Sequence, residues 1–437
     1  MGRGNCRWAV LALLAAGCGA VAAAPQLPFQ SPAIHAGVAS CAGSTCHGSE
    51  RPLEGSAVQQ DEYFTWRRKD AHASAYKSLQ SERGQRIAAN LGLRSAQDAP
   101  ECLACHSDFA APGRRGKRFQ LSEGVTCEAC HGPAENWLGP HISGSSHAQN
   151  VAAGLYPLEQ PEARAQVCLH CHMGSERKPI DHRLYGAGHP ELWFELDFFT
   201  LDEPAHFRVD ADFRKRKPAF SPLQTWAAGQ VVAARFYLEG LGGPGFAKAG
   251  LVPELRYFDC NACHHSMLAP RWQPAPGASP GQVRLSTAHL VMLRDLLAVL
   301  APQQQAAWQQ GLQELRAATT PAEVQASARK LRQALDGFAP AVIALDPGAD
   351  DALRLLDRVS QTGLEQVLGD YAAQRQVWAA LGAAGRSLQA AQRPEAEAVL
   401  AANKDLLKAI SDPDGYDPAK AGAALRKLRA LLPKAGK

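Results

Sequence analysis

Five short cysteine motifs constrain this chain more than any other feature of its sequence. Ten of the 12 cysteines in its 437 residues fall into five pairs, and a histidine directly follows the second cysteine of every pair. Two residues separate the cysteines in four pairs, and four residues separate them in the first pair. The motifs are Cys41-Ala-Gly-Ser-Thr-Cys46-His47, Cys102-Leu-Ala-Cys105-His106, Cys127-Glu-Ala-Cys130-His131, Cys168-Leu-His-Cys171-His172 and Cys260-Asn-Ala-Cys263-His264. Only Cys6 and Cys18 remain, both near the N-terminus, so no cysteine is left for a structural disulfide.

The repeated histidine decides between three uses of paired cysteines. Zinc knuckles contain Cys-x-x-Cys, but they do not need a histidine after every second cysteine. A disulfide framework has no use for the histidines either. Covalent haem uses all three side chains, because two thiols at this spacing each add to one vinyl group of a porphyrin and the next residue lies beneath the iron. The sequence therefore predicts five c-type haems, with His47, His106, His131, His172 and His264 as proximal ligands. The longer spacer of the first motif can loop outward and leave both thiols within reach of their porphyrin.

The second axial ligand of each iron is expected to be histidine. The chain has 15 histidines but only four methionines, of which Met1 lies in the N-terminal leader and Met173 and Met267 closely follow a proximal histidine. Histidine in place of methionine lowers the reduction potential, so mostly low-potential haems are predicted.

Three histidines are favoured as distal ligands: His72, His141 and His189. Small residues surround His72, and the glycines of Gly186-Ala-Gly-His189 permit a close approach of the backbone to a ligand. Further candidates are His35, His147, His182, His265 and His289. His170 and His206 are expected to be structural.

The N-terminus has the features of an export signal. Arg3 and Arg7 precede an apolar stretch that is too short to span a bilayer, and small residues up to Ala24 offer a cleavage site. We expect a periplasmic or otherwise exported protein that is soluble after cleavage, with a membrane anchor that stays attached as the alternative. Cys18 adds a weak lipoprotein signal and hence a route to membrane association. The net charge of +4 and the lack of a basic run do not indicate a nucleic-acid partner.

The fold is predicted to be mainly α with little β. After a signal peptide at 1–24, a four-haem cytochrome region covers 25–180 and an extension with the fifth haem covers 181–284. Glycine and proline from Pro270 to Gly281 indicate a boundary. Residues 285–437 lack cysteine and have apolar residues at helical spacing, which predicts a haem-free bundle of five or six helices. Helix starts are expected at Thr320-Pro321-Ala-Glu323 and at Asp417-Pro418.

Residues 38 to 173 resemble the tetrahaem cytochromes c that accept electrons from hydroxylamine oxidoreductase. The likeness lies in the order of four motifs, the segment Trp66 to Leu79 with His72, and Gly124-Val-Thr-Cys-Glu-Ala-Cys-His-Gly-Pro133 leading to His141. The resemblance implies a helical fold with haems stacked in pairs, and His72 and His141 as distal ligands. It also implies one haem without a sixth ligand, which by order is the haem at Cys102, Cys105 and His106. The longer first spacer, the fifth haem and the haem-free tail depart from that family, so its redox partner is not carried over.

Two functions fit these motifs best, and a third, a structural or filament-forming cytochrome, would need terminal haems exposed at two opposite ends. The favoured one is an electron carrier that relays electrons through low-potential, mostly bis-histidine haems, with a quinol oxidoreductase, another cytochrome or a terminal reductase as partners. The alternative is an oxidoreductase in which one five-coordinate haem acts on a small nitrogen or sulfur compound. The C-terminal bundle is expected to cover the haem region or to dimerise, and its sequence has no catalytic constellation.

Overall fold

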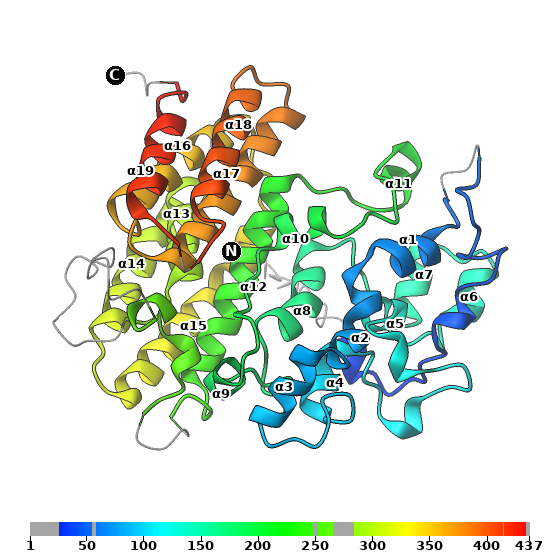
Figure 1. Ribbon diagram of the computed structural model, residues 1–437. Coiled ribbons are helices and arrows are strands. Elements are labelled where there is room, and N and C mark those ends of the chain that lie inside the picture. Colours follow the sequence, from blue (N-terminus) through cyan, green and yellow to red (C-terminus); the bar gives the residue numbers. More distant parts are fainter. Residues whose placement is uncertain (1–25, 55–57, 248–251, 265–283, 414, 434–437) are drawn as a thin grey trace, which may run out of the picture.

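The computed structural model describes residues 26–54, 58–247, 252–264, 284–413 and 415–433. The predicted signal peptide, Cys18, His265 and the glycine- and proline-rich boundary lie outside these residues. The described chain is mainly helical and contains isolated β-bridges but no strand, which confirms the predicted fold class. Short helices from the first part of the chain lie on one side of Figure 1, and long helices from the last part lie on the other.

The first part of the chain folds into short helices joined by turns. The α-helices are α1 (Glu62–Lys69), α2 (Ala75–Leu79), α3 (Glu82–Asn90), α4 (Pro100–His106), α5 (Cys127–His131), α6 (Leu138–Ile142), α7 (His147–Ala152) and α8 (Pro161–His172). The 3-10 turns are η1 (Pro28–Gln30), η2 (Val38–Ser40), η3 (Ala71–Ser74), η4 (Pro112–Arg114) and η5 (Leu121–Glu123). Helices this short are not stable alone, so they depend on packing. The buried apolar side chains of this part nevertheless form only small clusters, such as Val38 with Trp66 and Ala73. These small clusters cannot hold the short helices together by themselves, so this part of the chain needs a further apolar group for its helices to pack against.

The middle of the chain connects the two parts. It contains α9 (His182–Gly186), α10 (Leu196–Asp202), α11 (Ala211–Arg216), α12 (Pro222–Gly242), η6 (Leu255–Tyr257) and η7 (Cys260–Ala262). Helix α12 is one continuous and mostly apolar helix, and it is buried along most of its length. It packs against α8 on one side and against the long helix α15 (Pro321–Ile343) on another (Figure 1).

The last part of the chain is a bundle of longer helices. In addition to α15, it comprises α13 (Ala288–Leu300), α14 (Pro302–Ala317), α16 (Ala349–Glu365), α17 (Tyr371–Ala390), α18 (Ala396–Ala409) and α19 (Pro418–Arg429). Both predicted helix starts are confirmed: Thr320 and Glu323 form a capping box, and Asp417 caps α19. The bundle has seven helices in the described residues instead of five or six, in part because Pro302 starts a new helix directly after α13. One large core joins this bundle to α12 and to the segment around Tyr257. The exact domain limits remain a prediction.

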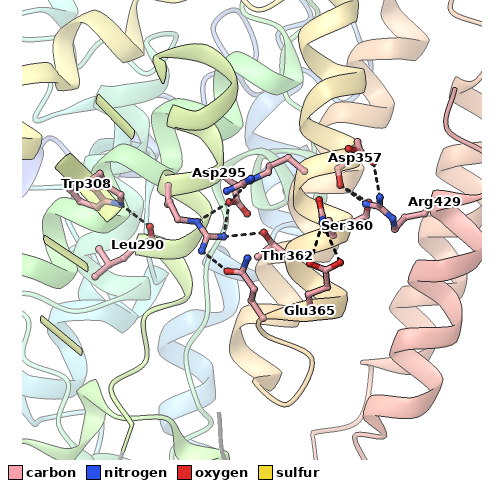
Figure 2. A network of polar contacts seen from close by, with 12 residues as sticks. Leu290, Asp295, Trp308, Asp357, Ser360, Thr362, Glu365 and Arg429 are labelled. Atoms are coloured by element: carbon pink, nitrogen blue, oxygen red, sulfur yellow. Dashed lines mark hydrogen bonds and ion pairs between the residues drawn. The ribbon is translucent and has the colours of Figure 1, made fainter. Parts of the chain in front are cut away.

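A buried polar network ties three helices of the bundle together (Figure 2). Asp295, which is fully buried in α13, accepts hydrogen bonds from Arg294 and from Arg358 of α16. Arg294 also donates to the hydroxyl oxygen of Thr362 at 3.0 Å. Nearer the surface, Arg429 of α19 donates to the carbonyl oxygen of Asp357 at 2.7 Å. These bonds fix the register of α13, α16 and α19.

Among the described residues, no helix combines the length and apolar character that a membrane span needs.

Candidate haem sites

Each Cys-x-x-Cys-His motif forms about one turn of helix. The second motif ends α4, the third is α5, the fourth ends α8, and the fifth begins as η7. Residues at i, i+3 and i+4 lie on the same face of a helix, so both thiols and the imidazole of a motif project to one side. In the fifth motif, the amide of His264 donates to the carbonyl oxygen of Cys260 at 2.7 Å and closes the turn.

The first motif reaches a comparable arrangement through a loop. Turn hydrogen bonds from Cys46 and Gly48 to the carbonyl oxygen of Gly43 fold the four-residue spacer back on itself. The amide of His47 then donates to the carbonyl oxygen of Cys41 at 3.2 Å. The loop therefore accommodates the two extra residues of the spacer between the two cysteines, and the histidine follows the second cysteine as in the other motifs.

A second histidine ring lies opposite every one of the five proximal histidines. The distances between ring centroids fall between 6.1 and 6.3 Å. The pairs are His47 with His141, His172 with His72, His106 with His189, His131 with His206, and His264 with His182. The angles between ring planes are 13°, 84°, 80°, 77° and 33°, in the same order.

This separation fits two imidazoles on opposite sides of one metal. A bond from a metal to an imidazole nitrogen is about 2 Å long and the ring centre lies roughly 1 Å further, so the two centroids are expected about 6 Å apart. Direct ring stacking would bring centroids as close as about 4.5 Å. Edge-on packing of aromatic rings also allows centroid distances of about 4.5–7 Å, but five proximal histidines that each face a second imidazole within a range of 0.2 Å have the uniform spacing that a common ligated atom requires.

Two favoured distal candidates come from short helices of the first part. His72 lies in η3, where Asp70 caps the turn by accepting a hydrogen bond from the His72 amide. Gly124 packs against this turn with φ of 81°, and a Cβ atom there would lie 2.6 Å from the carbonyl oxygen of His72. His141 lies in α6, and its ring meets that of Trp137 edge-on at 5.9 Å.

His182 and His189 share one compact segment. His182 begins α9, and its amide donates to Glu254 at 2.8 Å. His189 follows α9 after Gly188, whose φ of 107° is a conformation that favours glycine. Its ring lies opposite His106, whereas the family resemblance implied that the His106 haem has no sixth ligand. This departure arises because His189 lies beyond the part of the chain on which the resemblance was based.

His206 was expected to be structural, but its ring lies 6.2 Å from that of His131. It is in the irregular segment between α10 and α11, and its neighbour Phe207 is 42% exposed. No local sequence pattern marks this residue, because nothing around it resembles the glycines near His189 or the small residues near His72. The sequence offered one signal for it: five irons need five distal ligands, and any histidine outside the motifs can supply one.

The remaining described histidines face no proximal ring. His35 is buried and pairs with Asp108 at 3.0 Å, His147 lies 2.9 Å from Glu159, and the ring nitrogen of His289 meets Gln230 at 3.1 Å. His170 packs edge-on between Phe29 and Phe236, in agreement with a structural role. His265 lies outside the described residues. None of the candidate distal ligands His35, His147 and His289 is paired with a proximal ring among the described residues, although His35 lies beside Glu128 of the third motif and His289 lines a cavity together with His172 and Cys260.

Hydrogen bonds fix the orientation of several paired rings. The Nδ1 atom of His47 lies 3.1 Å from Glu62 Oε2, and that of His72 lies 3.0 Å from Asp70 Oδ1. His106 Nδ1 instead meets the carbonyl oxygen of Ala75 at 3.0 Å. Because Nδ1 is used in these contacts, Nε2 is left to face the partner ring. This is the usual arrangement of a histidine that binds a metal.

Burial keeps other rings in the form that binds metals. It lowers the pKa of His131 to about 3 and that of His172 to about 4. A neutral imidazole has a free lone pair for a metal, so both rings are ready to act as ligands near neutral pH.

The ten motif cysteines are all free thiols, and thiols of different motifs approach each other. A hydrogen bond with Cys127 lowers the pKa of Cys41, and a hydrogen bond with Cys105 lowers the pKa of Cys171 to about 5. The first motif thus adjoins the third, and the second adjoins the fourth. Free thiols, paired imidazoles and sparse apolar clusters together fit covalently attached haem.

Residues 40–132 match the family described as "Cytochrome c554 and c-prime". This region resembles cytochrome c554. A curated relative, cytochrome c-554 of Nitrosomonas europaea, is 28% identical over 149 residues, which cover 30% of this chain and 62% of the relative. The predicted resemblance to this kind of cytochrome is confirmed, and it supports covalently bound c-type haem. No solved structure matches the chain.

Proposed function

We propose that this protein is an exported pentahaem cytochrome c that relays electrons between redox partners through five bis-histidine haems. The cysteines of the five motifs would hold the porphyrins, and the five histidine pairs would hold the irons. Each haem supplies a site that takes up and gives up one electron without a change of ligands. The observation that carries the proposal is that every proximal histidine has a second ring 6.1–6.3 Å away.

Complete pairing favours a carrier over an enzyme. A haem that acts on a small nitrogen or sulfur compound needs an open position on its iron. The described residues offer a histidine for both sides of all five sites, so none is left open by the fold. A ligand set that does not change on reduction suits repeated electron transfer.

Contacts between the sites support a continuous relay. The first and third motifs meet through Cys41 and Cys127, and the second and fourth meet through Cys105 and Cys171. Asp70 lies beside His72, the distal histidine of the fourth site, and it also interacts electrostatically with His206 of the third site. These contacts join the first four sites into one group.

The segment after α8 connects the fifth site to this group. His182 of the fifth site and His189 of the second belong to α9 and the turn that follows it. Tyr185, between them, lies near both His189 and Cys260. Haems held by His182 with His264 and by His189 with His106 would therefore share one segment of the chain, an arrangement that would suit electron exchange between the fifth and second sites.

The partners follow from the proposed chemistry. Electron exchange needs only a small, weak docking contact near a haem edge, so another cytochrome, a membrane quinol oxidoreductase or a terminal reductase would suit. We place the protein in the periplasm because c-type haem and the predicted signal at 1–24 both point to export. The C-terminal bundle would cover α12 and support the fifth haem.

Electron paramagnetic resonance of the oxidised protein tests this proposal. Bis-histidine ferric haem is low-spin, and the angle between its imidazole planes sets the shape of the signal. Nearly perpendicular planes give a single feature at large g, and nearly parallel planes give a rhombic spectrum. We expect three signals of the first kind, from the pairs at 77°, 80° and 84°, and two rhombic signals from the pairs at 13° and 33°. A stoichiometric high-spin haem would contradict the proposal and favour the enzyme.

A further inference from the structure

The segment from 204 to 220, here called the strap, is held to the rest of the protein mainly by its two ends. It connects α10 to α12 and contains α11. Within the described residues, every hydrogen bond and ion pair of the strap stays inside it: Asp210 caps α11 through the amide of Phe213, and Arg216 pairs with Asp212. The strap contributes no residue to the buried apolar clusters of the described chain.

The strap has its own small set of contacts and an exposed surface. Phe207 stacks on Phe213 with centroids 5.8 Å apart, and Lys217 lies over the Phe213 ring. Phe207 and Val209 are 42% and 46% exposed. The strap can therefore keep its local structure without help from the surface beneath it.

The strap meets the haem region at His206 and, less closely, at the half-buried Lys217, which interacts electrostatically with Glu159 and His131. The ring of His206 lies over that of His131, and neither ring nitrogen of His206 has a hydrogen-bond partner among the described residues. His131 is fixed independently, because it ends α5 and its carbonyl oxygen accepts from the amide of Tyr156. One member of this pair is thus anchored, and the other is on a loosely attached segment.

The other distal histidines are held more firmly. His72 is fixed by Asp70 and by the amide of Val125, which donates to the His72 carbonyl oxygen at 3.0 Å. The turn before His189 is tied to α3 by Asn90, which donates to the carbonyl oxygen of Ala187 at 3.0 Å, and the Nδ1 atom of His189 lies 2.8 Å from the carbonyl oxygen of Pro190. In His206, by contrast, binding to the metal would be the main tie between the strap and the haem region.

We infer that the strap is a displaceable lid and that His206 is the exchangeable sixth ligand of the third haem. This inference rests on the proposed function, because it needs a haem between His131 and His206. When the strap lifts, the bond from His206 Nε2 to the iron breaks and a small neutral diatomic molecule such as carbon monoxide forms a bond in its place. No electron is transferred in this exchange. The third haem is then a gated ligand-binding site within a relay that is otherwise closed.

Carbon monoxide binding to the reduced full-length protein tests the inference. We expect the gas to bind to one haem in five, with a rate that levels off as its concentration rises, because lifting of the strap becomes limiting. In His206→Ala the binding rate should rise in proportion to the gas concentration. At the concentration where the wild-type rate has levelled off, the rate of the variant should be at least about tenfold higher. The matched control is His189→Ala, which opens the second haem and should add a second binding haem while the slow phase of the third is kept.

Several outcomes would overturn the inference. The wild-type protein could bind no gas over hours, or His206→Ala could leave the kinetics of a single binding haem unchanged. Amide hydrogen exchange of the wild-type protein gives a check that needs no variant: gas binding should speed exchange in 204–220 and leave α12 unchanged, and equal exchange with and without the gas would also count against the lid. A high-spin haem in the oxidised protein before any gas is added would instead contradict the proposed function, so the two failures can be told apart.

Discussion

The imidazole rings of His47 and His141 face each other with centroids 6.1 Å apart and planes only 13° from parallel. His47 ends the first cysteine motif, whereas His141 belongs to α6, beyond the third motif. The chain between them forms two further motifs before it returns to the first. This crossing is typical of the whole haem region, where each site takes its two histidines from different segments.

Replacement of His141 by alanine should convert one haem of five to a high-spin form. The first site would lose its distal imidazole, and α6 is exposed enough to tolerate the smaller side chain. The measurement is the high-spin signal in electron paramagnetic resonance, quantified against total haem. The control is His147→Ala, since His147 contacts Glu159 and faces no proximal ring. An equal high-spin signal in both variants would disprove the assignment.

Replacement of Glu62 by glutamine should raise the reduction potential of the first haem. A carboxylate at Nδ1 makes imidazole a stronger donor and stabilises ferric iron, so its loss favours the reduced form. We expect a rise of roughly 60 mV, which equals a tenfold change in the one-electron equilibrium. Asp70→Asn should do the same at the fourth haem, since Asp70 lies 3.0 Å from His72 Nδ1.

Spectroscopic redox titration of the five haems measures both shifts. Glu82→Gln is a suitable control, because Glu82 is an exposed residue in the first turn of α3. If Glu62→Gln and Asp70→Asn give the same titration curve as Glu82→Gln, these two carboxylates do not set the reduction potentials of the haems.

Replacement of Asp295 by alanine should strongly destabilise the C-terminal bundle. It leaves Arg294, which is only 3% exposed, without its buried counter-charge. Removal of one partner from a buried ion pair costs about 3–5 kcal/mol. Thermal unfolding followed by circular dichroism measures the loss. Asp357→Ala, at the more exposed pair with Arg429, should cost no more than about 1 kcal/mol, and equal losses would argue against the buried network in Figure 2.

Replacement of Asp370 by asparagine should stabilise the protein increasingly as pH rises from about 4 to 7. Burial, and then the nearby charge of Asp259, raise the pKa of Asp370 to about 6. The folded state therefore holds a proton that the unfolded state has lost, and ionisation at higher pH costs up to about 3 kcal/mol. Asparagine removes this cost and can still accept the bond from the amide of Ala373. The difference in Tm between variant and wild type should grow with pH, and a constant difference would contradict the assignment.

The chemistry of the sites can be predicted from the amino-acid sequence more completely than the way in which the sites are assembled. The attachment residues, the helical fold and the helix starts at Thr320 and Asp417 follow from local spacing, because each depends on residues within one helical turn. Pairing of distal histidines depends on contacts between distant segments, and local composition favoured only His72, His141 and His189. His206 could not be chosen because its segment has no distinctive pattern, and the packing of α12 against α15 requires the folded chain.

The haem content of the purified mature protein tests the central claim most directly. Intact mass under denaturing conditions, combined with the pyridine haemochrome spectrum, gives the number of covalently attached haems per chain. We predict five, with a mass that also accounts for all ten motif cysteines as thioethers. A colourless protein, or a chain that carries four haems or fewer after expression with a working maturation system, would contradict this account.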